Sequence, residues 1–229
     1  MKRIVEPELL DELPPGDSRA VRSRRDLCRV NAWMRNHATM ANALQTAVNG
    51  QTPKQIVELG AGDGDFLLRV AGKVSPRWSG VNVTLLDRQK VVTPQTLAAY
   101  ASLGWRAEAV TVDVFDWSRT GDPAEVVIAN LFLHHFDDAR LAGLLHAFAD
   151  RARLFIAIEP RRAPWPLFCS RLIWAIGCNA VTRHDGTVSV RAGFSGNELS
   201  TLWPDKKNWQ LPEQRASWFS HLFIARRTG

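Results

Sequence analysis

Short apolar runs that alternate with longer amphipathic stretches constrain the fold of this chain most strongly. The runs span residues 55–59, 81–86, 107–112, 126–129 and 154–158. Their β-branched or continuously apolar character is typical of strands that are buried on both faces of a parallel sheet. The stretches 64–73, 93–103 and 137–150 are long enough for the helices that connect such strands. Strand alternating with helix predicts an α/β chain with a doubly wound, mostly parallel sheet.

The segments before and after this pattern predict further elements at both ends of the chain. Residues 209–216 and 218–226 are strand-like with no helix between them, which predicts a C-terminal antiparallel hairpin and seven strands in all. Residues 1–18 are polar and acidic and predict a loose arm. Residues 19–48 lack proline and glycine and predict two helices. We therefore divide the chain into an N-terminal arm with a helical cover, residues 1–50, and a domain at residues 51–229.

Composition, cysteine use and charge exclude several classes of protein. With 45% hydrophobic and 23% charged residues, the chain is neither disordered nor fibrous. No apolar run approaches the ~20 residues that cross a bilayer, and the first residues lack the apolar centre of a signal peptide, so we expect a cytoplasmic protein. Cys28, Cys169 and Cys178 have neither disulfide nor zinc spacing, and we expect no metal site.

The formal charge of +6 is concentrated in basic flanks around an acidic middle. We interpret these flanks as solvated faces, with RNA, a membrane surface and an anionic substrate as the alternatives.

A strand that runs into a glycine loop and then a helix is the most informative segment. Glycines at 60, 62 and 64 follow Glu58. Glycine lets the backbone turn sharply and approach a ligand, and the next helix offers free N–H groups. The spacing departs from the G-x-G-x-x-G of dinucleotide-binding folds and argues against NAD. A plain tight turn is the structural alternative.

The segment from Glu58 to Gly64 resembles the first motif of class I S-adenosylmethionine-dependent methyltransferases, which has the form E-x-G-x-G-x-G. Asp87 ends the second predicted strand, and Asp113 and Val114 follow the third. The segment from Asn130 to Asp138 looks like the fourth motif of small-molecule methyltransferases related to quinone-biosynthetic enzymes. The resemblance covers roughly residues 54–160 and the C-terminus. It implies a Rossmann-like methyltransferase fold for the domain at 51–229.

The resemblance also implies that S-adenosyl-L-methionine is the cofactor. In that family an acid at the position of Asp87 takes both ribose hydroxyls, since a carboxylate accepts two vicinal O–H groups. Asp113 would accept from the adenine amino group, and Val114 would cover the ring. The alternatives are a helix cap or a loop acid for the two aspartates and a strand end for Asn130. The residues implied for the cofactor site are Glu58, Gly60, Ala61, Gly62, Gly64, Asp87, Arg88, Asp113, Val114 and Asn130.

The fourth motif limits the classes of methyl acceptor that we expect. Asn130-Leu131-Phe132-Leu133 differs from the [D/N]-P-P-aromatic motif of methyltransferases that act on amino groups of bases or on glutamine amides. The neutral Asn130 also argues against the magnesium site of catechol methyltransferases. We therefore expect a metal-independent enzyme.

Residues 161–185 form the second distinctive segment. Phe168, Leu172, Ile173 and Ile176 predict an apolar helix face, with Trp165 and Trp174 nearby, beside the carboxyl edge of the sheet, where ligands bind. In the resembling enzymes an insertion here forms the acceptor pocket, so we predict a lid for a small apolar or aromatic acceptor. Core packing is the alternative. We interpret Arg161, Arg162 and Arg171 as solvated, with a substrate carboxylate and peripheral membrane contact as open alternatives.

Methyl transfer to oxygen needs a base near the acceptor, because an alkoxide or phenolate attacks far better than a neutral hydroxyl. The candidate catalytic residues are His135 and Glu159, just beyond strand ends, and His184, which Asp185 follows; His134 is also available. Loop residues without a catalytic part are the alternative. Carbon methylation of an activated ring needs no strong base.

We therefore predict O- or C-methylation of a small apolar or aromatic molecule. An RNA methyltransferase and a non-catalytic binding module are the rival hypotheses. We do not expect nucleic acid as a partner, and the sequence does not predict the oligomeric state.

Overall fold

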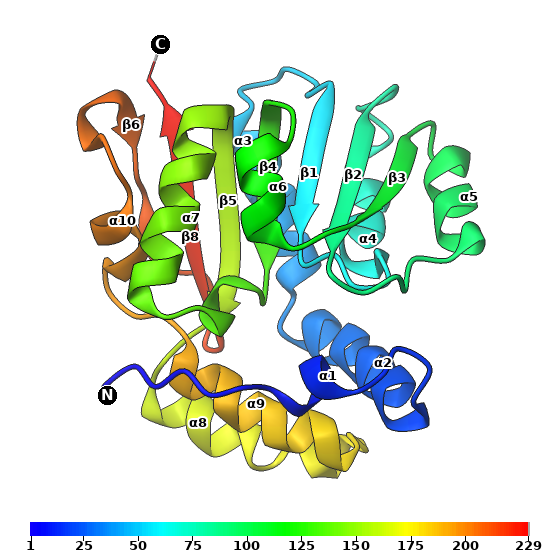
Figure 1. Cartoon of the computed structure of the whole chain (residues 1–229), viewed down its shortest axis with the longest axis vertical. Coiled ribbons are helices and arrows are strands. Elements are labelled where there is room, and N and C mark those ends of the chain that lie inside the picture. The colour runs from blue at the N-terminus through cyan, green and yellow to red at the C-terminus, as the bar shows by residue number, and fades with distance from the viewer. Residues whose placement is uncertain (229) are drawn as a thin grey trace.

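A mixed sheet organises the chain in the computed structural model, which describes residues 1–228 (Figure 1). The strand order is β3-β2-β1-β4-β5-β8-β6, with β7 also paired to β8. Strands β1 to β5 are parallel, and β8 is antiparallel to β5. The strands are β1 (Gln55–Leu59), β2 (Asn82–Asp87), β3 (Arg106–Thr111), β4 (Ala124–Asn130), β5 (Ala152–Pro160), β6 (Trp209–Gln210), β7 (Glu213–Arg215) and β8 (Ser220–Arg227). The predicted doubly wound sheet and its C-terminal antiparallel strands are confirmed.

The sheet has eight strands instead of the predicted seven because the first strand of the hairpin is interrupted. Pro212 lies between β6 and β7, and proline has no N–H to donate to a neighbouring strand. Its carbonyl still accepts a hydrogen bond from the Ile224 amide of β8 at 2.9 Å. Both short strands therefore pair with β8.

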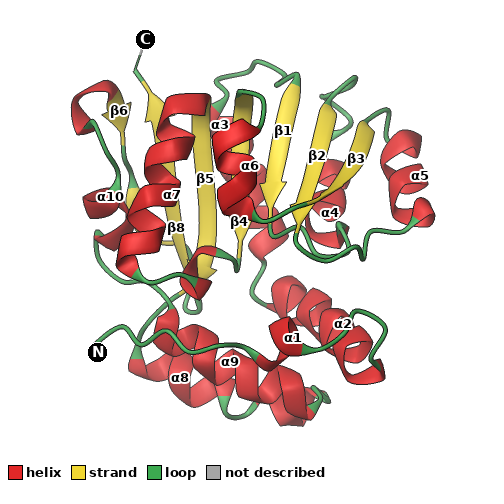
Figure 2. Ribbon diagram, viewed as in Figure 1, coloured by secondary structure: helices red, strands yellow, loops and turns green. Residues whose placement is uncertain are grey.

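Helices cover both faces of the sheet (Figure 2). On one face, α3, α4 and α5 pack on strand residues such as Ile56 and Val83; on the other, α6, α7 and α10 pack on alternate residues such as Val57. The short helix α6, which begins directly after Asp113, was not among the predicted elements. The helices that flank the sheet are α3 (Asn36–Ala47), α4 (Asp65–Val74), α5 (Pro94–Ser102), α6 (Val114–Thr120), α7 (Asp138–Arg151) and α10 (Glu198–Leu202).

Residues 1–12, which we call the N-terminal strap, are ordered, so the prediction of a loose arm is wrong. The strap includes the short helix α1 (Leu9–Glu12). The Arg3 guanidinium donates to the Phe136 carbonyl at 2.8 Å and pairs with Asp138 at 2.7 Å. Glu8 is buried. The polar residues of the strap suggest a solvated arm in the sequence. In the structure they contact partners that are more than a hundred positions away along the chain.

Helix α2 (Ser18–Trp33) and the insertion after β5 form one helical cover beyond the carboxyl edge of the sheet (Figure 1). The insertion is not a single apolar helix, as its spacing predicts, but consists of α8 (Pro164–Ser170), the 3₁₀ turn η2 (Ile173–Ile176) and α9 (Ala180–Ala192). The Ser23 hydroxyl of α2 lies 2.9 Å from the Thr182 hydroxyl of α9, which joins the two parts. Within residues 1–228, no helix is both long and apolar enough to cross a membrane.

Candidate functional site

A cavity of about 770 Å³ lies between the carboxyl edge of the sheet and the helical cover. This volume falls within the range of roughly 300–1,000 Å³ that is usual for small-molecule and cofactor sites. The glycine loop and the segments after β2, β3 and β4 line one side. The strap, α2, α8, η2 and α9 line the other. The site therefore forms at the sheet edge that the strand pattern predicts.

The three glycines of the loop differ in what they face. Gly62 lines the cavity with a φ of 55°, and a Cβ placed on it would meet nothing within 4 Å. A Cβ on Gly60 would lie 2.2 Å from the Phe132 ring, and one on Gly64 would lie 2.9 Å from the Leu85 side chain. Packing therefore requires Gly60 and Gly64, whereas at Gly62 the absence of a side chain keeps part of the cavity open.

The Asp87 carboxylate is fixed at the edge of the same cavity. Its Oδ2 accepts from the Gly62 amide at 2.8 Å, and its Oδ1 accepts from the Gln89 amide at 2.7 Å. Burial is the largest influence on this carboxyl group and raises its pKa, although both backbone hydrogen bonds oppose the rise. Because an ionised carboxylate offers about four lone-pair sites, each oxygen retains capacity for one more O–H donor. Behind it, the guanidinium of Arg88, which also lines the cavity, donates to the Asp11 carbonyl at 2.8 Å.

Asp113 and Val114 also line the cavity, at the end of β3. The Asp113 carboxylate caps α6 by accepting from the Phe115 amide at 2.8 Å, so the helix-cap interpretation is correct for this residue. Val114 is buried and presents an apolar surface beside it. A capping carboxylate that borders a cavity can still accept a hydrogen bond from a ligand.

Four residues that the resemblance implies for the cofactor site do not reach the cavity wall. They are Glu58, Ala61, Gly64 and Asn130. Glu58 is buried, and within residues 1–228 its Oε2 has no hydrogen-bond partner. Burial, together with the nearby acids Asp63 and Asp87, raises the pKa of Glu58 well above its ordinary value. Ala61 belongs to the loop itself, and its side chain is buried in the core.

Asn130 joins β4 to the helical cover. Its amide nitrogen donates to the Asn31 side chain at 3.1 Å, and its oxygen accepts from Asn36 at 3.3 Å. Three asparagine side chains thus connect the sheet to α2 and α3. The sequence prediction that Asn130 contacts the cofactor gains no support from this position.

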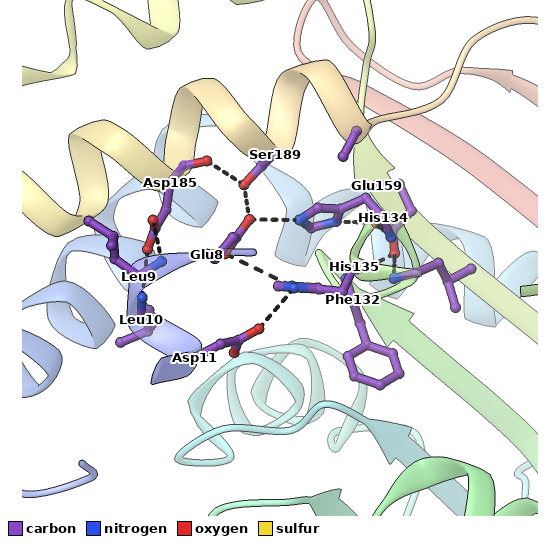
Figure 3. A network of polar contacts seen from close by, with 12 residues as sticks. Glu8, Leu9, Leu10, Asp11, Phe132, His134, His135, Glu159, Asp185 and Ser189 are labelled. Atoms are coloured by element: carbon purple, nitrogen blue, oxygen red, sulfur yellow. Dashed lines mark hydrogen bonds and ion pairs between the residues drawn. The ribbon is translucent and has the colours of Figure 1, made fainter. Parts of the chain in front are cut away.

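A buried polar network borders the cavity, and its contacts are drawn in Figure 3. Glu159 is fully buried and accepts from the Phe132 and Leu133 amides at 3.1 and 2.9 Å. Its Oε2 lies 2.7 Å from Nδ1 of His134. The other ring nitrogen of His134 lies 3.1 Å from Oε1 of Glu8. Because both ring nitrogens face carboxylate oxygens, both donate, and the imidazole carries a proton on each.

The pKa shifts of His134 and Glu8 agree with a doubly protonated imidazole. Burial alone would lower the pKa of His134, but the hydrogen bonds that its ring donates to Glu159 and Glu8 outweigh this effect and raise the pKa to about 9. Burial would raise the pKa of Glu8, and the contacts with His134 and His135 lower it overall. The network is therefore an imidazolium held between two carboxylates.

Two of the three predicted catalytic residues, Glu159 and His184, do not line the cavity. Glu159 is enclosed by the β4 loop and His134, so it orients that loop and is not available as a base. His184 lies on α9 with 49% of its side chain exposed and does not line the cavity. Asp185 is 3.0 Å from His184, but it also accepts from the Leu9 and Leu10 amides and thereby anchors the strap.

His135 is the predicted base that does line the cavity. Its Nδ1 lies 3.1 Å from Oδ2 of Asp11, and its Nε2 lies 3.9 Å from Oε2 of Glu8. Sequence reasoning missed Glu8, Asp11 and Ser189, whose hydroxyl donates to Glu8. No local pattern marks these residues, because Glu8 and Asp11 contact His134 and His135, in the turn after β4, and Ser189 of α9 contacts Glu8.

The ligand atoms of Glu8, His134 and His135 lie within 4.8 Å of one another, a grouping that could hold a metal ion. Ion pairs and hydrogen bonds account for the same positions. The prediction of a metal-independent site remains a prediction.

The insertion presents different residues to the cavity from those that its sequence suggests. Pro166, Cys169, Ser170 and Ile173 line the cavity. Trp165, Phe168 and Trp174 are more than half exposed, and none of them lines the cavity. The core-packing alternative is therefore wrong for these three aromatic residues, and so is the prediction that Phe168 and Trp174 form the acceptor wall.

No family model and no curated protein matches this chain. Comparison with solved structures finds similar folds. The plantazolicin methyltransferase BpumL in complex with SAH shares 11% identity over 93% of this chain and 92% of that one, with a TM-score of 0.63. An O-methyltransferase family protein from Burkholderia thailandensis shares 19% identity over 93% of this chain and 61% of that one, with a TM-score of 0.61.

A third similar structure is the magnesium protoporphyrin IX methyltransferase ChlM from Synechocystis PCC 6803 with bound SAH. It shares 15% identity over 89% of this chain and 86% of that one, with a TM-score of 0.59. The chain therefore has the Rossmann-like fold of small-molecule methyltransferases, as the motifs predict. At identities this low the likeness establishes the fold, and the activity rests on the site itself.

Proposed function

We propose that this protein is an S-adenosylmethionine-dependent methyltransferase that acts on a small apolar or aromatic acceptor. The observation that carries the proposal is the open approach at Gly62 beside the fixed Asp87 carboxylate, at the carboxyl edge of the sheet. Open α/β sheets bind ligands at this edge. The cofactor products present in the similar structures support the same interpretation.

The cavity residues fit the cofactor that the motifs imply. The Asp87 carboxylate can accept both ribose hydroxyls while it holds the Gly62 amide. Val114 offers a buried apolar surface to the adenine ring, and Asp113 borders it as an acceptor for the amino group. Gly62 leaves room for the backbone to contact the ligand closely.

When bound, the cofactor supplies an electrophilic methyl group on its sulfonium sulfur. His135 then accepts the acceptor's hydroxyl proton at Nε2, because its Nδ1 faces Asp11. The strap and the insertion line one side of the cavity, where they would reduce contact with water and hold the acceptor beside the cofactor. For C-methylation of an activated ring, the same orientation suffices without a strong base.

Binding and transfer experiments test the proposal against its rivals. Calorimetry with S-adenosylhomocysteine measures the cofactor site, and a metabolite extract with methyl-labelled cofactor reveals the acceptor. A binding module predicts affinity without transfer. An RNA methyltransferase predicts label in RNA and steeply salt-dependent RNA binding. Absence of cofactor binding would overturn the proposal.

Asp87→Ala is expected to lower the affinity for S-adenosylhomocysteine by about tenfold to a hundredfold. The substitution removes a partly buried acceptor, and such a loss costs about 1–3 kcal/mol. Calorimetry checks the affinity, and circular dichroism checks that the variant is folded. Asp122→Ala, at an exposed acid between α6 and β4, is the matched control and should bind normally. A folded Asp87→Ala protein with unchanged affinity would contradict the assignment of Asp87 to the ribose.

His135→Gln is expected to lower kcat by about a hundredfold or more for a hydroxyl acceptor, since a positioned general base contributes about 10²–10⁴. Affinity for S-adenosylhomocysteine should stay within about twofold, because the proposed base acts on the acceptor. His184→Gln is the matched control and should leave kcat unchanged. Equal kcat values in the two variants would remove the catalytic role from His135.

We further propose a metal-independent reaction and a cytoplasmic location. Activity that persists after treatment with a chelator would support the first. The three free cysteines agree with a cytoplasmic location, because a reducing compartment keeps thiols unpaired.

A further inference from the structure

The outer face of the insertion exposes an unusual concentration of large apolar side chains. Among the described residues, ten large hydrophobic side chains are exposed, and five of them fall within residues 165–176. Their exposed fractions range from 43% to 58%. We call these five residues the apolar rim; they are Trp165, Phe168, Leu172, Trp174 and Ile176. Contiguous exposed apolar surface is typical of interaction sites.

The apolar rim lies on elements that also line the cavity. These short elements, α8 and η2, contribute Pro166 and Ile173 to the cavity wall. Two further tryptophans are exposed outside the insertion. Trp33 lines the cavity, and its ring lies 4.4 Å from that of Phe219, which also lines it. The exposed Trp218 precedes Phe219.

Hydrogen bonds connect these elements. The Arg161 amide, at the start of the insertion, donates to the Phe219 carbonyl at 2.8 Å. The Arg29 guanidinium of α2 lies 3.4 Å from the Ile176 carbonyl of η2. The exposed apolar residues of α2, the insertion and the β7–β8 turn therefore lie on elements that are joined by hydrogen bonds and that line the same cavity.

The charged residues of the segment that carries the rim have one sign. Residues 161–184 contain four arginines and no aspartate or glutamate. Arg162 is buried and pairs with Glu198. Arg171 and Arg183 are exposed, and neither has an ion-pair partner within residues 1–228. A basic apolar surface of this kind complements an anionic one.

We propose that the apolar rim is a docking surface for an anionic lipid bilayer, which places the mouth of the cavity against the membrane. Tryptophan and phenylalanine side chains are favoured at the membrane–water interface, and arginines beside them are attracted to anionic headgroups. An apolar acceptor then passes from the bilayer into the cavity without crossing water. That route rests on the proposed function, whereas docking itself does not.

Vesicle flotation with the full chain, without cofactor, tests the docking. The vesicles contain phosphatidylcholine alone or phosphatidylcholine with phosphatidylglycerol. Binding is expected to be stronger with phosphatidylglycerol and to weaken as salt is added, because the attraction to headgroups is screened. Wild-type protein that binds neither type of vesicle would overturn the proposal.

Two double variants locate the surface. Trp165→Ala/Trp174→Ala is expected to lower vesicle binding at least about tenfold, since each exposed ring loses apolar area that the interface would bury. Arg171→Glu/Arg183→Glu is expected to lower it about thirtyfold or more, because each basic residue near an anionic surface contributes substantially. The charge-matched control is Arg77→Glu/Arg106→Glu, at exposed positions near the amino ends of β2 and β3.

The control should bind vesicles nearly as the wild type does. An equal loss in the control would attribute binding to net charge and overturn the assignment to the rim. Sedimentation analysis adds a second comparison. If the wild type is a dimer and the tryptophan variant is a monomer, a second copy of the chain covers the rim. That result would also overturn the assignment of the rim to a membrane. The affinity for S-adenosylhomocysteine, measured by calorimetry, should be unchanged in all three variants. A failure of the docking proposal can therefore be distinguished from a failure of the proposed function.

Discussion

Gly62→Val is expected to abolish detectable binding of S-adenosylmethionine and S-adenosylhomocysteine while the protein remains folded. A Cβ at Gly62 meets no atom within 4 Å, so the side chain would project into the cavity where the ligand approaches. The φ of 55° adds backbone strain of about 1–2 kcal/mol for a residue with a side chain. The main consequence is steric exclusion of the ligand, which calorimetry measures directly.

Gly80→Val is the control for backbone strain. Gly80 has a φ of 71°, also has nothing within 4 Å of an added Cβ, and lies before β2 at the opposite end of the strands. Both variants should lose similar stability in thermal melts, and only Gly62→Val should lose the ligand. If Gly62 serves only a tight turn, the two variants would be equally destabilised and would bind equally well.

The features predicted correctly from the sequence are those that a local pattern encodes. Strands β1, β2, β4 and β5 are largely apolar because both faces of the sheet are covered there, whereas the edge strand β3 is mostly exposed. The glycine loop and Asp87 were found for the same reason. Each lies directly after a strand, and parallel strands bring their carboxyl ends to one edge.

The strap could not be predicted because its determinants are non-local. Glu8 looks like a solvated acid in the sequence, yet it is buried against His134 and Ser189. Asp185 looks like a partner for the adjacent His184, yet it also accepts from two amides of α1. No spacing rule connects positions that are 126 to 181 residues apart.

The sequence pattern mispredicts the insertion as a single helix because the helical period does not continue through the whole segment. A face built at spacings of three and four holds only while the helix continues. Here α8 ends at Ser170 and η2 has 3₁₀ geometry, so residues on either side of the break turn differently. Phe168 and Trp174 consequently lie outside, and Ile173 lines the cavity.

The unfolding free energy of the wild type is expected to fall by about 3 kcal/mol between pH 6.5 and 9, because of His134. Hydrogen bonds to Glu159 and Glu8 raise the pKa of His134 from 6.5 to about 9 in the folded state. A folded-state pKa above the unfolded value means that folding favours the proton. The stabilisation is therefore complete below pH 6.5 and is lost as the pH rises through 9.

His134→Gln isolates this effect, since glutamine does not titrate. Chemical denaturation of the variant should give a lower unfolding free energy at pH 6.5 and a flat profile up to pH 8. Burial also raises the pKa of Cys28, to about 12, which adds a loss of stability at still higher pH in both proteins. His146→Gln is the matched control, because His146 is exposed and only 3.8 Å from Asp150 on the same helix. It should retain the wild-type profile.

A flat wild-type profile, or a His134→Gln protein that keeps the slope, would mean that His134 is neutral when folded. One of its ring nitrogens would then face a carboxylate oxygen without a proton between them, and two acceptors in contact repel. Either Glu8 or Glu159 would have to carry the proton instead. Glu159 accepts two backbone amides that favour its ionised form, so the proton would reside on Glu8, and the strap would be held by a neutral hydrogen bond.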